Sequence, residues 1–172
     1  MMMQMLAAGG LEPLTDHIRA ADEDNPSGYY ELERVKQLET DKAWLEDAEG
    51  RVVKLISALL KHLPRTHTYK VIFMRRTMQE ILDSQRQMLI RRGEPTDKVP
   101  DEQMAAMFQK HLAQVESWLA AQANIETIYV SYNEVIADAR PNAERINEFL
   151  GGSLNVEAMA AAADRALYRQ RR

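Results

Sequence analysis

Two arginines and a serine are the residues of this sequence whose types and spacing most directly suggest chemistry. Arg75 and Arg76 follow the apolar run YKVIFM, and Ser84 stands eight residues after Arg76. Free N–H groups at the start of a helix favour anions, and a guanidinium adds a planar pair of donors that fits a phosphate. One interpretation is therefore a phosphate site. The alternative is two surface arginines beside an ordinary helical serine.

The elements that must position these residues alternate between strands and helices. Apolar and β-branched runs predict strands at 51–57, 69–75 and 125–132. Amphipathic spacing predicts helices over residues 31–49, 77–92, 102–123 and 141–150, after a first helix that ends at Gly9 and Gly10. This order predicts an α/β fold with a mainly parallel sheet, in which ligands bind at the carboxyl ends of the strands.

Composition narrows the function classes. The chain has 172 residues, of which 45% are hydrophobic and 28% charged, and this suits one domain over residues 1–172. A net charge of −4 gives no global attraction to nucleic acid or to an anionic membrane. Because there is no cysteine and no H-E-x-x-H motif among the four histidines, we expect no metal centre. Since the sequence shows no spanning apolar run and no signal peptide, the expected compartment is the cytoplasm.

Four longer segments stand in an order that is typical of one family. They are NPSGYYELERV, VVKLISALLKHLP, KVIFMRRTMQEILDSQ and SYNEVIADARPNAERINEFLGG. In this order they resemble the sulfotransferases, which transfer a sulfuryl group from 3′-phosphoadenosine 5′-phosphosulfate (PAPS) to a hydroxyl or an amine. The resemblance covers nearly the whole chain. It implies a three-layer α/β/α fold related to the phosphate-loop nucleotide-binding proteins.

The resemblance also implies a donor site. In the family a strand ends in arginine, and a serine about eight residues later joins that arginine in holding the 3′-phosphate of the nucleotide. Arg76 and Ser84 have this spacing, whereas Arg75 is closer to the usual strand-end position, so both arginines are PAPS-binding candidates. The implied partners are thus PAPS, used as donor substrate without a metal, and an acceptor that the resemblance leaves unidentified.

The first ten residues, MMMQMLAAGG, predict a helix that has an end but no capping residue in front of it. Family members place a strand and a loop rich in glycine, serine and threonine before this helix, and that loop wraps the 5′-phosphosulfate. No such loop occurs in residues 1–172. We therefore expect a bacterial-type sulfotransferase domain that is shortened at its amino end and impaired in transfer.

Sulfuryl transfer also needs a general base for the acceptor. Cytosolic members of the family use the histidine of a Lys-Thr-His run, but the matching residues here are Lys54, Leu55 and Ile56. Other branches use a carboxylate that follows the first helix. The catalytic candidates are therefore His17, Glu23 and His62. Further candidates are Asp16, Asp22, Glu31 and His67. The alternative for each of them is a solvated loop residue or a packed side chain.

Two functions follow from these observations. The first is a PAPS-dependent sulfotransferase-family domain with an unknown hydroxyl or amine acceptor. The second is a non-catalytic α/β protein that binds partners through its helices, or through the exposed edge of its sheet. Such an edge would also allow self-association.

Overall fold

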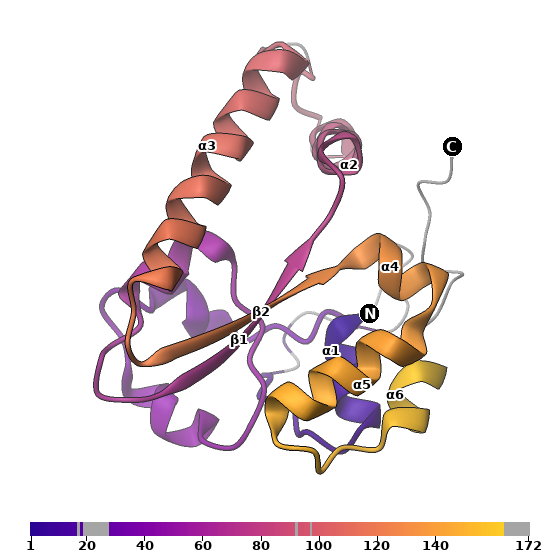
Figure 1. Cartoon of the computed structure of the whole chain (residues 1–172). Coiled ribbons are helices and arrows are strands. Elements are labelled where there is room, and N and C mark those ends of the chain that lie inside the picture. Colours follow the sequence, from indigo (N-terminus) through magenta and orange to yellow (C-terminus); the bar gives the residue numbers. More distant parts are fainter. Residues whose placement is uncertain (17, 19–27, 92, 97, 164–172) are drawn as a thin grey trace.

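The computed structural model describes residues 1–16, 18, 28–91, 93–96 and 98–163 (Figure 1). At its centre lie two parallel strands, β1 (Tyr69–Arg75) and β2 (Ile125–Ser131). Their register pairs Tyr69 with Ile125 and Arg75 with Ser131, so both strands end at the same level. The strands predicted at 69–75 and 125–132 are thereby confirmed.

Helices cover both faces of this small sheet, which gives the three layers of the predicted α/β fold (Figure 1). Alternate strand residues, Val71 and Phe73 among them, face a cluster that includes Trp44 and Leu119. Leu119 belongs to the long helix α3 (Asp101–Ala120). The other strand residues face a second cluster built by α1 (Met2–Ala8), α5 (Ala139–Leu150) and α6 (Val156–Ala161). The sheet is therefore buried on both sides, as its continuous apolar sequence requires.

The connection between the two strands carries α2 (Met78–Arg91) and then α3. Figure 1 shows α2 standing beyond the end of β1, while α3 runs back alongside the sheet to reach β2. Three predicted helices are thus confirmed with shifts of a few residues: α2, α3 and α5. Single residues set the two ends of α5. At its start the Asp138 side chain accepts from the Arg140 N–H, and at its end Gly151 stops the helix at φ 111°.

The predicted strand at 51–57 is wrong. Val52 makes only an isolated parallel bridge with Pro13, and the chain then enters a 3₁₀-helix, η3 (Ser57–His62). The segment is extended, and Val52 and Val53 pack into opposite clusters. Val52 and Val53 therefore alternate as strand residues do, but among the described residues the Val52 backbone bonds only to Glu12 and Leu14, which flank Pro13.

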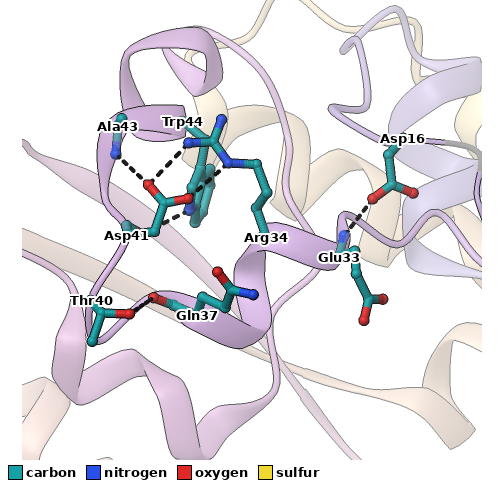
Figure 2. Close-up of polar contacts among 8 residues, drawn as sticks. All are labelled: Asp16, Glu33, Arg34, Gln37, Thr40, Asp41, Ala43 and Trp44. Atoms are coloured by element: carbon teal, nitrogen blue, oxygen red, sulfur yellow. Dashed lines mark hydrogen bonds and ion pairs between the residues drawn. The ribbon is translucent and has the colours of Figure 1, made fainter.

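The helix predicted over 31–49 is also wrong, because the chain forms two 3₁₀-helices there, η1 (Glu33–Gln37) and η2 (Ala43–Ala48). Asp41 holds the break between them (Figure 2). Its carboxylate accepts two bonds from Arg34, at 2.8 and 3.0 Å, and one from the Ala43 N–H at 3.1 Å. Such local bonds offer the backbone an alternative to a continuous helix.

The Asp41 contacts predict a dependence of stability on pH. The hydrogen bond from Arg34, with help from the Ala43 N–H, holds the pKa of Asp41 below its usual value. A lowered folded-state pKa adds stability above the unfolded-state pKa of about 3.9, and this stability is lost as pH falls through the folded-state pKa. Asp41→Asn should therefore be less stable than wild type at pH 7, and the difference should narrow as the pH falls below about 3.9.

Urea unfolding at a series of pH values measures this difference. Glu39→Gln, an exposed glutamate between η1 and η2, serves as the matched control and should remain close to wild type at neutral pH. A difference between wild type and Asp41→Asn that persists unchanged at pH 2 would contradict the assignment.

Candidate anion-binding site at the end of β1

The two arginines at the end of β1 lie in different surroundings. The Nη2 of Arg75 lies 2.7 Å from Oε1 of Glu116 on α3, and its guanidinium lies 4.1 Å from the centre of the Tyr129 ring. Arg76 lies instead among residues of α2 and of the segment after β2, since Glu80 and Tyr132 are its neighbours. The guanidinium of Arg75 is thus already paired with Glu116 on the α3 side of the sheet.

Arg76 and Ser84, the predicted pair, are brought together by the structure. Nη1 of Arg76 donates to Oγ of Ser84 at 3.4 Å, which is at the long end for a hydrogen bond. Arg76 precedes α2 by two residues, and steps of four along the helix place Glu80 and Ser84 on the same side. The spacing therefore forms one row of arginine, carboxylate and hydroxyl along the first turns of α2.

Glu80 occupies the middle of this row and is buried, with 6% of its surface exposed. Its Oε2 lies 3.5 Å from Nε of Arg76, and its Oε1 accepts from Nδ2 of Asn133 at 2.8 Å. Asn133 belongs to a short helix that the sequence did not predict, α4 (Tyr132–Ala137), which follows β2 directly. The parallel register brings the starts of α2 and α4 together, because both strands end at the same level.

Tyr132 completes the surroundings of Arg76. The guanidinium lies 4.6 Å from the centre of the Tyr132 ring. Burial raises the pKa of Tyr132; the charge of Arg76 opposes this increase, and that of Glu80 adds to it. The side chain of Arg76 is one-third exposed, so a cation flanked by a ring, a carboxylate and a hydroxyl borders solvent at a helix start. The paired N–H donors of a guanidinium fit two oxygens of one phosphate, so this arrangement suits a phosphate group.

Only some of the catalytic candidates belong to the part of the chain that the structure describes, and their contacts lie elsewhere. His17, Glu23 and Asp22 lie outside the described residues. Two further candidates hold loops: Asp16 accepts from the Glu33 N–H (Figure 2), and Glu31 pairs with Lys54 at 3.1 Å.

The two candidate histidines precede the amino end of β1. His62 ends η3, and His67 lies two residues before the strand, with Nδ1 2.9 Å from Oγ1 of Thr66. Arg76 follows the opposite end of β1, and a seven-residue strand spans about 20 Å. A role for His67 in the same site would therefore require the ligand to bridge the length of the sheet.

Sequence reasoning missed Glu80 and Asn133. A signal for Glu80 was present, because a glutamate stands between the apolar residues of α2 and lies four residues from both Arg76 and Ser84. No comparable signal existed for Asn133, whose position depends on the pairing of two distant strands.

Metal-binding groups and membrane-spanning helices are absent from the described residues. Within those ranges, no three histidine, aspartate or glutamate side chains are grouped so that they could hold a metal ion. None of the helices built from the same residues combines the length and the apolar character needed to cross a membrane.

The structure thus combines a three-layer α/β fold with two arginines at the junction between a parallel strand and the following helix. A protein-family model described as the sulfotransferase family matches residues 5–155, a range that includes both strands and the Arg76–Ser84 row. The chain belongs to the sulfotransferase family. No curated protein and no solved structure matches it.

Proposed function

We propose that this chain is a sulfotransferase domain in which Arg76 and Ser84 bind the 3′-phosphate of PAPS, or of the product 3′-phosphoadenosine 5′-phosphate (PAP). The observation that carries the proposal is the contact between Arg76 Nη1 and Ser84 Oγ at the end of a parallel strand, inside the range that the family model matches. Ligands of open α/β sheets bind at this edge. Arg75 becomes the second choice, because Glu116 already holds its guanidinium.

The proposed reaction moves a sulfuryl group from PAPS to a hydroxyl or amine acceptor, in one domain over residues 1–172 and in the cytoplasm. No metal is needed for it, and neither nucleic acid nor a membrane is a proposed partner. Transfer also requires donors around the 5′-phosphosulfate, and the 172 residues contain no G-x-x-x-x-G-K-[ST] sequence. We therefore propose that these residues retain the 3′-phosphate half of the site and are impaired in transfer.

A thermal-shift titration with PAP tests the binding site. PAP should raise the unfolding midpoint as its concentration increases, because it binds the folded state. Arg76→Ala should weaken PAP binding by about 10-fold to 100-fold, the range expected when a hydrogen bond to a charged group is lost. Ser84→Ala should weaken it less, because it removes a single hydroxyl.

Arg75→Ala distinguishes between the two arginines. It removes the ion pair with Glu116 on the α3 side and should leave PAP affinity within about twofold of wild type. The assignment to Arg76 would be wrong if Arg75→Ala abolished the shift while Arg76→Ala left it unchanged. The binding proposal itself would fail if millimolar PAP did not move the wild-type midpoint.

A second candidate function is a binding protein without catalysis. It is favoured by the sheet, which in the described residues has two strands, so each strand has an outer edge that the ladder does not use. A partner strand, including one from a second copy of the chain, could pair with such an edge. Association that rises with protein concentration, together with no response to PAP, would favour this candidate.

A further inference from the structure

Glu80 is an unusual residue for its position. It is a carboxylate with 6% of its surface exposed, in a helix that begins at the end of the sheet. A buried carboxylate is rare unless it is paired, because burial removes its hydration. Its neighbours should therefore show what it is retained for.

Two contacts tie Glu80 to both strand ends. Asn133 Nδ2 donates to Oε1 at 2.8 Å from α4, the helix after β2. Nε of Arg76, the residue after β1, lies 3.5 Å from Oε2. Glu80 thus connects the segment that carries the candidate phosphate ligand to the neighbouring strand end.

Three contacts surround the guanidinium of Arg76. Glu80 lies at the Nε edge, the Tyr132 ring lies 4.6 Å from the guanidinium carbon, and Ser84 lies at Nη1. An arginine side chain has many rotamers, and a ligand must otherwise order them when it binds. A guanidinium that is held beforehand keeps its fork aligned for two oxygens of one phosphate.

We propose that Glu80 is a positioning residue, which holds the guanidinium of Arg76 in the orientation that binds the 3′-phosphate of the donor nucleotide. The inference rests on the proposed function of Arg76 and Ser84. It adds a role for a residue that does not touch the ligand and a link, through Asn133, to the second strand.

The direction in which Glu80→Gln changes PAP affinity distinguishes positioning from simple electrostatics. A carboxylate 3.5 Å from Arg76 weakens the positive potential at the site, so removing its charge should by itself tighten anion binding. Positioning predicts the opposite. Glu80→Gln keeps the size of the side chain and an oxygen for Asn133, yet it removes the charge that attracts Nε. We expect it to weaken PAP binding by about tenfold, which corresponds to about 1.4 kcal/mol.

The experiment compares PAP with adenosine 5′-phosphate, which lacks the 3′-phosphate, by calorimetric and NMR titration of the whole chain. In Glu80→Gln the affinity for PAP should fall while that for adenosine 5′-phosphate stays unchanged, a selective loss that general destabilisation would not produce. Asp83→Asn is the matched control, since Asp83 is the neighbouring carboxylate on α2 and binds Gln79 at 3.1 Å. It should retain wild-type affinity for both nucleotides.

A second measurement needs no nucleotide. The Nε–Hε resonance of Arg76 in ¹⁵N NMR should shift in Glu80→Gln and stay in place in Asp83→Asn. If Glu80→Gln does not fold, Asn133→Ala, which removes only the amide that holds Oε1, should shift the same resonance and weaken PAP binding by a smaller factor.

The outcomes distinguish the two proposals. PAP affinity that is equal or tighter in Glu80→Gln overturns positioning and leaves the binding site standing. If wild type does not bind PAP, the proposed function fails, and the Arg76 resonance decides whether Glu80 orders the guanidinium. An unchanged resonance overturns that ordering, and a shifted one supports it.

Discussion

Replacing Trp44 with alanine should lower the free energy of unfolding by about 3–5 kcal/mol, the usual range for removing a buried aromatic side chain. Trp44 is 2% exposed and belongs to the cluster that covers the α3 side of the sheet, with Leu38, Phe73 and Leu119. Its indole Nε1 donates to the Asp41 carbonyl at 3.2 Å, so the substitution also leaves that carbonyl without this donor. The cavity would lie where η2, α3 and the sheet meet.

Urea unfolding followed by circular dichroism measures this loss. Trp118→Ala is the matched control, because Trp118 lies at the edge of the same cluster and is only partly buried. Its loss should be clearly smaller. A loss below about 1 kcal/mol for Trp44→Ala, within the range of ordinary surface changes, would show that this cluster is not packed as described.

Replacing Met159 with alanine should lower the free energy of unfolding by about 2–5 kcal/mol, because the side chain is fully buried in the cluster on the other side of the sheet. Met159 lies on α6 and meets Gly9 at the end of α1, where a Cβ added to Gly9 would come within 2.6 Å of Met159 Cγ. Met107→Ala is the matched control, since Met107 is 60% exposed on α3. It should stay within about 0.5 kcal/mol of wild type.

The contact with Gly9 makes a coupling measurable. Gly9→Ala alone should destabilise by about 1–3 kcal/mol through overpacking, because the φ of Gly9 is −71° and an alanine meets no backbone strain there. In the double variant the new methyl group enters space that Met159 has left. The combined loss should therefore be smaller than the sum of the two single losses. Simple additivity would contradict the close packing of α1 on α6.

The parts of the fold that the sequence predicts well are those with local causes. The run from Tyr69 to Met74 is apolar at nearly every position, which favours a strand covered on both faces, and Gly151 marks the end of α5. The segments that it predicts wrongly are decided by distant or competing contacts. Val52 and Val53 alternate between the two clusters as strand residues would, but within the described residues the Val52 backbone bonds only to Glu12 and Leu14.

The candidate site likewise has one feature that the sequence could predict and others that depend on distant contacts. The meeting of Arg76 and Ser84 was predictable, because the family resemblance singled out their eight-residue spacing across the start of α2. The choice between the arginines could not, because it depends on Glu116 of α3 lying beside Arg75. The contact between Glu80 and Asn133 depends on the register of β1 against β2, which no local pattern specifies.

The packing of α1 against α6 has a consequence for biosynthesis. Met5 and Leu6 of α1 are fully buried, and the cluster that buries them includes Met159 of α6 and Ile146 of α5. A ribosome makes α1 long before it makes these partners. The methionine-rich helix therefore stays without them while the residues in between are translated, and this half of the protein closes only after α6 has left the exit tunnel. Until then the nascent chain exposes apolar surface of the kind that chaperones bind.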